Sequence, residues 1–319
     1  MWDWNVAVFC RNEQAAIARC IDGIADAIGD RRVLTTLIVN GSTDDSAAVA
    51  LRTAQRRGVA LAVYSIGFAD KANAINRFFY ELHEPARYYF FIDAYARISA
   101  AALVALETCL ATRPDIVAAT GVAANGRTMA RNTQPTLSWG GHLHGQLHAL
   151  RADFLERFVA RKLRIPIGLY YGDGLIGSMA MHDLDPINVE WKTQRIGGSP
   201  DATYEIPELS PFRWDDIKRQ FHRKVRQQRG RLENLAIRSI VYTKNYEGLP
   251  EYADTMIMAY LDHFGRPKVS AIDRFFQSLA LRQVRFAQRP EPAAMQPVLL
   301  RRLVPAPAAA SAGIRLQPA

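Results

Sequence analysis

The sequence has few cysteines and no long uncharged apolar run. Its three cysteines, Cys10, Cys20 and Cys109, are odd in number, widely spaced and without a CxxC pair, which argues against a disulfide scaffold or a zinc site. No uncharged apolar run approaches the ~18 residues of a membrane-spanning helix. The start, MWDWNVAVFCRNE, lacks the basic and apolar regions of a signal peptide. We therefore expect a cytoplasmic protein with reduced thiols.

Two common nucleotide-binding motifs are missing where they would be expected. No GxGxxG follows the first apolar run, and the chain contains no GxxxxGK[ST]. A dinucleotide-binding fingerprint and a Walker-type nucleoside triphosphatase are therefore not predicted. The segment CRNEQAA after the first apolar run has no glycine, which argues against a nucleotidyltransferase, although that class remains an alternative.

The chain has a positive net charge. Its 40 Lys and Arg outnumber 31 Asp and Glu, for a net charge of +9, so an anionic partner is expected: a nucleotide, a nucleic acid or an anionic membrane surface. Nucleic acid is disfavoured, because a base-stacking surface needs exposed aromatics among the basic residues. Binding of a nucleic acid would also give no role to the acids at the strand ends.

Apolar and helical patterns alternate through the first half of the chain. Short apolar runs at 5–10, 33–39, 59–64, 87–93 and 115–122 predict strands, and the segments between them have helical spacing. Such alternation predicts an α/β fold with a mostly parallel sheet flanked by helices. Ligands of these sheets bind beyond the carboxyl ends of the strands. The polar residues at those positions are Arg11, Asn12, Glu13, Asn40, Ser42, Asp44 and Asp93.

Six segments in a fixed order carry a resemblance to a known family. They are VAVFCRNE, LIVNGSTDDS, DKANAIN, FFIDAYA, GQLHALRADFLE and YYGDGLIG. Together they resemble family-2 glycosyltransferases of the GT-A fold over roughly residues 4–185. In that family the first strand ends in N-E and the second in D-G-S-T-D, followed by G-K-x-x-A-x-N. A D-x-D at a strand end and a later E-D that opens a helix complete the pattern.

The resemblance implies a domain organisation. Residues 1–212 would form the GT-A domain, with a donor half at about 1–122 and an acceptor half at about 123–212. Residues 213–289 would form a basic helical C-terminal extension. In residues 290–319, 14 of 30 are Pro or Ala, so this tail is predicted to be disordered.

The resemblance also implies a donor site for a nucleotide-diphosphate sugar. Asp93 falls at the D-x-D and would hold Mg²⁺ or Mn²⁺, since a carboxylate at a strand end is a suitable oxygen ligand. Tyr95 replaces the second acid of that motif, which leaves metal dependence open. The donor-binding residues implied by position are Arg11, Glu13, Asn40, Ser42, Lys71 and Asp93. The plainer alternatives are a turn residue for Asn40, a solvated helix start for Lys71 and an ordinary strand end for Asp93.

On the acceptor side, Asp173 in YYGDGLIG is the candidate general base of an inverting transfer. An aspartate that caps a helix is the alternative. His144 and Arg151 would line the acceptor side. His142, His144 and His148 share one face if the segment is extended, which invites a metal-site interpretation. Nearby acids do not complete a ligand set, so a polar lining of the cleft is favoured over a metal cluster.

The run from Arg213 to Arg231 carries eight Lys and Arg against two Asp and predicts a helix that ends near Gly230. Three roles stay open for it: a solvated helix, a contact with the donor diphosphate through Arg223 and Arg226, or a contact with the inner face of the cell membrane. The stretch 271–286, with Arg274, Arg282 and Arg285, also permits membrane contact.

The expected function is thus an inverting glycosyltransferase of polysaccharide biosynthesis, with a carbohydrate or lipid-linked acceptor. The main alternative is a catalytically degenerate homologue that binds a nucleotide sugar or a protein, because the second acid of the D-x-D is absent and Asn40 replaces a family aspartate.

Overall fold

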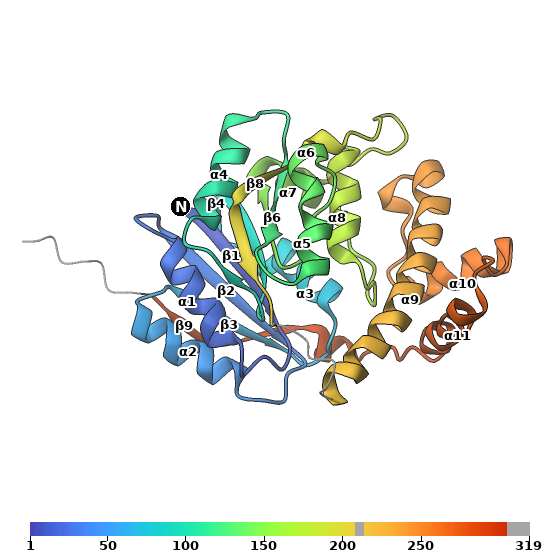
Figure 1. The fold of residues 1–319 in the computed structure, drawn as a ribbon, viewed down its shortest axis with the longest axis horizontal. Helices are drawn as coiled ribbons and strands as arrows, with labels where there is room; N and C mark the ends of the chain where they lie inside the picture. Colours follow the sequence, from blue (N-terminus) through green and yellow to red (C-terminus); the bar gives the residue numbers. More distant parts are fainter. Residues whose placement is uncertain (208–213, 305–319) are drawn as a thin grey trace, which may run out of the picture.

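The computed structural model describes residues 1–207 and 214–304. A central sheet carries helices on both sides, and a group of helices from the last third of the chain lies at one flank (Figure 1). The expected boundary at residue 212 and the last part of the expected tail, residues 305–319, lie outside the described residues.

The first half of the chain has the predicted alternation of strands and helices. The strands are β1 (Trp2–Cys10), β2 (Val33–Asn40), β3 (Leu61–Ile66), β4 (Ala86–Asp93), the two-residue β5 (Arg97–Ile98) and β6 (Ala118–Ala123). The helices between them are α1 (Ile17–Ala27), α2 (Ser46–Arg57), α3 (Lys71–Arg77) with a π-helical turn at Phe78–Leu82, and α4 (Ala102–Thr112).

The second half adds strands to the same sheet and more helices. It contains α5 (Arg127–Thr133), α6 (Pro135–Trp139), β7 (Leu147–Arg151), α7 (Ala152–Ala160), α8 (Gly172–Met181), a 3₁₀ turn (Thr193–Arg195) and β8 (Ile196–Glu205). The last third contains α9 (Trp214–Lys244), a 3₁₀ turn (Tyr246–Gly248), α10 (Ala253–Phe264), α11 (Ala271–Arg285), a 3₁₀ turn (Pro292–Met295) and β9 (Pro297–Leu303).

The described strands form one sheet in the order β5-β8-β6-β7-β4-β1-β2-β3-β9. Strands β4, β1, β2 and β3 are parallel neighbours, whereas β7 runs antiparallel to β4 and to β6. Because β1, β2 and β4 point the same way, their carboxyl ends meet at one edge of the sheet. That edge holds Cys10, Asn40 and Asp93, and Asp93 lies beside Phe9 in the register.

Among the described residues, two large apolar cores cover the two faces of the sheet. Alternate residues along β1 illustrate the division: Val6 and Val8 pack with α1, α2 and α4, while Ala7 and Phe9 pack with α3, α7, α8, α9 and α10. The period of two in a strand sends neighbouring side chains to opposite faces. Strands buried on both faces read as continuous apolar runs, which is why these strands were predictable.

Two expectations about the last third of the chain are wrong. Helix α9 continues past Gly230 to Lys244, because Gly230 lies at a close contact inside the helix and does not end it. The segment from Pro290 to Val304 was expected to be disordered, but it contains a 3₁₀ turn and then β9, which pairs antiparallel with the edge strand β3.

Candidate functional site

A cleft of about 1370 Å³ opens at the carboxyl ends of β1, β2 and β4. Its walls come from the strand ends, from the start of α3, from the loop before α8 and from α9 and the segment after α11. Most of the predicted site residues line it: Arg11, Glu13, Asn40, Lys71, Asp93, His144, Asp173, Arg223 and Arg226.

Asp93 is fixed at the base of this cleft by two side chains. Its Oδ1 accepts a hydrogen bond of 2.5 Å from the Lys71 ammonium, and its Oδ2 accepts one of 3.0 Å from the Tyr95 hydroxyl. Gln146 donates in turn to the Tyr95 oxygen at 2.8 Å. Tyr95 therefore orients the carboxylate that it stands beside, where the family motif has a second acid.

Gly145 marks the point where the charged groups converge. A Cβ atom at this position would lie 2.9 Å from Asp173 Oδ2, 3.1 Å from Lys71 Nζ and 3.4 Å from Asp93 Oδ2. The two acids, which are 80 residues apart in the sequence, thus reach the same small volume as the Lys71 ammonium. Any side chain in place of Gly145 would fill that volume.

Burial disfavours the charged form of Lys71, but the negative charges of Asp93 and Asp173 outweigh it and raise the pKa of the ammonium. Lys71 is the first residue of α3, and Asp70 caps this helix through a 2.6 Å bond from the Asn73 N–H to its Oδ1. The helix start and the charge partners together hold a protonated amine in the cleft.

The loop before Asp173 is held by α9. The backbone N–H of Tyr170 donates to both Glu233 carboxylate oxygens at 3.1 Å, and Arg229 binds both Glu233 and the Gly168 carbonyl. Glu233 is fully buried, and this burial raises the pKa of its carboxyl to about 7, although Arg229 opposes the shift. On the opposite side, Asp70 Oδ2 accepts from the Gly168 N–H at 2.8 Å.

Gly230 and Arg226 complete this contact between α9 and the loop. A Cβ at Gly230 would lie 1.8 Å from Cε2 of the Tyr171 ring, so the helix touches the ring with its backbone. The Arg226 guanidinium lies 5.4 Å from the centre of the Tyr170 ring. The middle of α9 therefore sets the position of the residues that lead into Asp173.

Ser42 lies outside the cleft lining and has a structural role. Its hydroxyl accepts from the Asn12 N–H at 2.9 Å, and the Asn12 side chain accepts from the Thr43 N–H at 2.8 Å. These bonds join the loops that follow β1 and β2. Asn12 is held in this contact with a φ of 54° and does not cap α1, which begins at Ile17.

Asn40 lies at the turn that follows β2. It is buried, lines the cleft and precedes Gly41, which has a φ of +68° and would clash with Ala69 if it carried a Cβ. A tight turn here brings the end of β2 against the loop before α3.

The structure does not bring Arg151 to the cleft. Because β7 runs antiparallel to β4, Arg151 lies beside Tyr88 and not beside Asp93. Its guanidinium pairs with Asp153 and with the carbonyls of Pro114 and Ile116. We therefore leave Arg151 out of the proposed site.

The three histidines do not form a cluster. The segment 142–146 is not a strand, and His142 is exposed while His148 is buried in a stack on Phe91. His144 lines the cleft, and burial lowers its pKa to about 4. No group of three His, Cys, Asp or Glu that could hold a metal is found among the described residues.

The donor atoms at the site nevertheless suit a hard cation. Asp93 Oδ2 and Asp173 Oδ2 both face the position beside Gly145, and carboxylate oxygens are what Mg²⁺ and Mn²⁺ prefer. Mg²⁺ keeps several waters and is often held by one or two carboxylates with substrate phosphates. Asp93 would be the protein ligand that holds such an ion.

Three residues of the site, Gly145, Gln146 and Glu233, were not predicted from the sequence. Gly145 and Gln146 fall between His144 and His148, where only the histidines were considered, and Glu233 lies past Gly230, where the predicted helix was expected to end. The sequence signal for Glu233 was its position as the single acid between Asp216 and Glu247, since a buried acid needs a partner.

No protein-family model and no curated protein sequence matches this chain. Solved structures do resemble it. The mannosyltransferase PcManGT from Pyrobaculum calidifontis, in complex with GDP-Man and Mn²⁺, has a TM-score of 0.57 at 19% identity, over 92% of this chain and 77% of that one. TarS 1–349 from S. aureus, in complex with UDP-GlcNAc, has a TM-score of 0.51 at 13% identity, over 88% of this chain and 80% of that one.

The chain has the GT-A fold. This fold confirms the sheet, the flanking helices and the helical C-terminal region that the sequence predicted. At these identities the likeness concerns the fold alone. Within residues 1–207 and 214–304, no helix combines the length and the apolar character that crossing a bilayer requires.

Proposed function

We propose that this protein is an inverting glycosyltransferase that moves a sugar from a nucleotide-diphosphate donor to a hydroxyl group of an acceptor. The observation that supports this most directly is the convergence of Asp93, Lys71 and Asp173 beside Gly145. Asp93 with Lys71 would serve the donor half of such a transfer, and Asp173 would serve the acceptor half.

The donor half has to neutralise a leaving diphosphate. Lys71 supplies a fixed positive charge next to Asp93, and Arg223 and Arg226 add two more in the same cleft. Fixed cations that face developing negative charge lower the barrier most in a site with little water. Mg²⁺ or Mn²⁺ held by Asp93 would supply further positive charge to the diphosphate.

The acceptor half needs a base. The Asp173 carboxylate takes the proton of the acceptor hydroxyl as its oxygen bonds to the anomeric carbon. The bond from that carbon to the diphosphate oxygen breaks on the opposite face, and the electron pair leaves with the nucleoside diphosphate. One displacement inverts the configuration at the anomeric carbon.

The acceptor is a carbohydrate or a lipid-linked hydroxyl compound, and we place the enzyme in the cytoplasm. The three cysteines are free, which accords with a reducing compartment. The proposed context is the synthesis of a polysaccharide, where nucleotide sugars and growing glycans meet.

The test measures release of nucleoside diphosphate from a panel of nucleotide sugars, with and without acceptor sugars and Mn²⁺. Asp173→Asn should lower kcat by about 10²–10⁴-fold, because a missing general base costs that much, and it should leave the donor Kd within about threefold. Asp201→Asn, at an exposed position on β8, is the control. Donor binding without release of nucleoside diphosphate in any mixture would favour the degenerate binding protein.

A further inference from the structure

Helix α11 has apolar residues on its exposed side as well as on its buried side. Gln277, Ala280, Leu281 and Val284 form the buried side. Facing away from it, Ile272 is 74% exposed, Phe275 56% and Phe286 75%. With Leu279 and Arg282 they recur every three or four residues, which places them along one line of the helix. We call Ile272, Phe275, Leu279, Arg282 and Phe286 the outer stripe.

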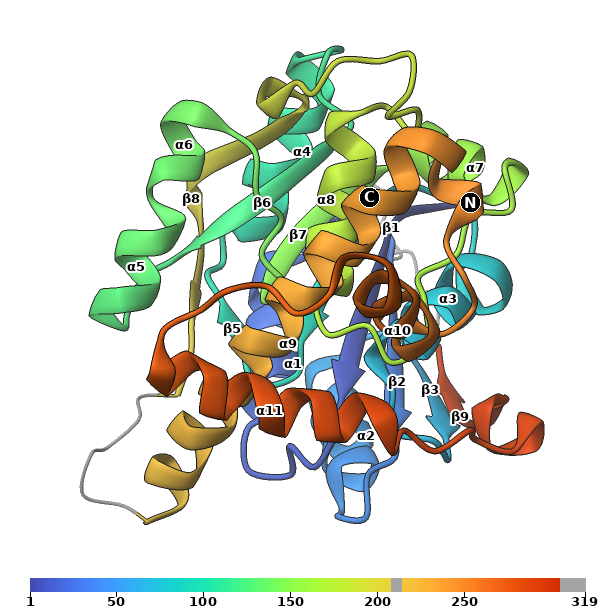
Figure 2. The ribbon, with the colours of Figure 1, turned by 90° about the vertical axis from the view of Figure 1, so that its right-hand side faces the viewer.

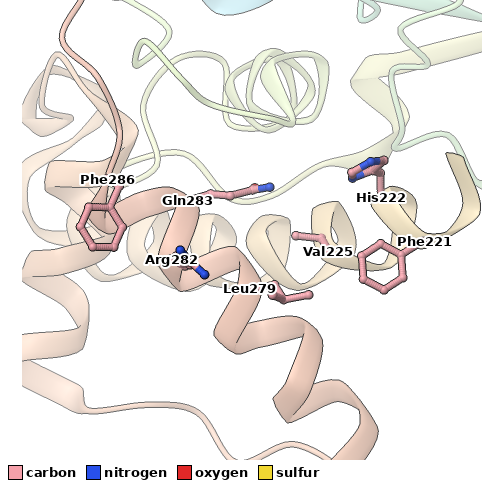
Figure 3. A pocket seen from close by; sticks show the side chains of 7 residues that line it. All are labelled: Phe221, His222, Val225, Leu279, Arg282, Gln283 and Phe286. Atoms are coloured by element: carbon pink, nitrogen blue, oxygen red, sulfur yellow. The ribbon is translucent and has the colours of Figure 1, made fainter. Parts of the chain in front are cut away.

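A groove of about 510 Å³ lies between the outer stripe and α9. Figure 3 shows Val225 of α9 and Leu279 of α11 in the middle of it, with Phe221 and Phe286 toward its two ends. Arg282 and His222 also line the groove. Contiguous exposed apolar surface of this kind marks a site of interaction with a partner or a membrane.

The ionisable groups around the groove are mainly cationic. The exposed basic residues of α9 and α11 that lie outside the cleft lining include Lys218, Lys224, Arg231, Arg274, Arg282 and Arg285. The one acid of α11, Asp273, is bound by Gln228 and Arg231. Glu233, an acid on the part of α9 whose side chains are described, is fully buried. The partner is therefore anionic and has apolar parts.

The groove adjoins the catalytic cleft. Gln283 lines both cavities, and Ala287, Gln288 and Arg289, which follow α11, line the cleft. In Figure 2, α11 lies across α9 on the side of the molecule where the strand ends open. A partner seated on the outer stripe would lie next to the mouth of the cleft.

Two other partners fit these observations less well. A second copy of this chain, docked through the same face, would place arginines against arginines. A nucleic acid would use aromatic rings as stacking platforms, whereas Ile272 and Leu279 are aliphatic and only two of the five stripe residues carry a ring. Aromatic and aliphatic side chains flanked by Arg and Lys are typical of helices that lie at an anionic bilayer surface.

We propose that α9 and α11 dock on an anionic membrane surface, with the apolar residues of the outer stripe among the acyl chains and with Arg282 and the flanking Arg and Lys at the lipid headgroups. The groove between the helices takes up one lipid chain. This orientation brings the mouth of the cleft to the membrane, where a lipid-linked acceptor is reached directly. The choice of acceptor rests on the proposed function, but docking itself does not.

The experiment measures co-sedimentation of the full chain with vesicles of phosphatidylcholine alone and of phosphatidylcholine with 30% phosphatidylglycerol, without donor or acceptor. We expect binding to the anionic vesicles that weakens in high salt. The double variant Phe275→Ser, Phe286→Ser should lower the partition coefficient about tenfold or more. Each of these exposed rings would leave water on docking, and its burial in the bilayer would contribute to the free energy of binding. The triple variant Arg274→Gln, Arg282→Gln, Arg285→Gln should lower it about tenfold or more.

Matched controls are Phe264→Ser, at an exposed position on α10, and Arg52→Gln, at an exposed position on α2. Both should bind vesicles as the unaltered chain does. Equal binding to neutral and anionic vesicles, stripe variants that bind like the controls, or a stripe-dependent dimer in gel filtration would each overturn the proposal. Release of nucleoside diphosphate, measured on the same variants in solution, tests the proposed function separately.

Discussion

At the scale of single residues, Lys71 supplies the positive charge beside the two acids of the site. Its ammonium lies near two carboxylates, and one substitution removes the cation without removing either acid. Lys71→Met should raise the Kd of the donor by about ten- to a hundredfold, because hydrogen bonds to charged groups are the stronger ones. Isothermal titration calorimetry, with the donor identified in the release assay, measures the Kd of both the variant and the unaltered chain.

Lys192→Met, at an exposed loop position, is the control for the loss of one positive charge. If the two variants bound the donor equally well, Lys71 would have no contact with the diphosphate. Circular dichroism of both variants separates a loss of affinity from a loss of fold.

A second prediction at this scale concerns His148 and the pH dependence of stability. Burial lowers the pKa of His148 to about 4, so the folded protein keeps it neutral while the unfolded chain takes up a proton near pH 6.5. The unfolded state then binds more protons, and the free energy of unfolding falls as the pH drops from about 6.5 toward 4. This group accounts for up to about 3 kcal/mol of that fall.

His148→Phe keeps a ring against Phe91 and removes the titration. Its unfolding free energy, measured by urea denaturation between pH 7 and 4.5, should vary less steeply with pH than that of the unaltered chain. Equal slopes for His148→Phe and the unaltered chain would show that His148 is protonated in the fold.

The sequence could predict the placement of Asp93 but not that of Arg151. Asp93 ends an apolar run, and the carboxyl end of a parallel strand reaches the ligand edge wherever the strand lies in the sheet. Arg151 also ends a run, but β7 is antiparallel to β4, so its end lies at the opposite edge. Strand direction depends on long-range pairing, which the local pattern of residues does not contain.

At the scale of elements, α9 acts as the support of the loop before α8. A Gly→Ala change inside a helix ordinarily stabilises it by up to about 1 kcal/mol. At Gly230 the added Cβ would lie 1.8 Å from the Tyr171 ring, so the ring has to move, and Asp173 follows two residues later. Gly230→Ala should lower the Tm and reduce kcat about tenfold or more, with a smaller effect on donor affinity.

Asn234→Ala is the matched control for this element, because Asn234 is exposed on the same helix and the change improves helix propensity alone. It should raise the Tm slightly and leave kcat unchanged. A Gly230→Ala protein with a raised Tm and unaltered kcat would contradict the supporting role of α9.

The prediction of elements failed where packing overrides local preference. Gly230 was read as a helix end, since glycine often follows the last turn, but here it serves a close approach between backbone and ring. Strand β8 (Ile196–Glu205) was missed because IGGSPDATYE is rich in residues that strands disfavour. It joins the sheet because β6 and β5 lie on either side of it.

At the scale of the whole molecule, the last described segment adds an edge strand to the sheet. Strand β9 covers the edge of β3, and the residues before it contact the loop before α3 and α3 itself. The Ala294 carbonyl accepts from the Phe68 N–H at 2.8 Å, and the Met295 carbonyl accepts from the Asn73 side chain at 3.1 Å. A stretch rich in Pro and Ala thus supports the loop that leads into Lys71.

This arrangement predicts different outcomes for two shortened chains. A chain that stops after Arg289 loses β9 and both carbonyl contacts, which leaves the β3 edge unpaired and open to aggregation. Its Tm should fall by about 5 °C or more, and its donor affinity should fall as well, because Lys71 begins the helix that Met295 holds. A chain that stops after Val304 keeps all of these contacts and is the control. Thermal unfolding and donor titration of both chains decide the matter: if the shorter one matched the control in Tm and donor affinity, β9 would contribute nothing to the sheet or to the site.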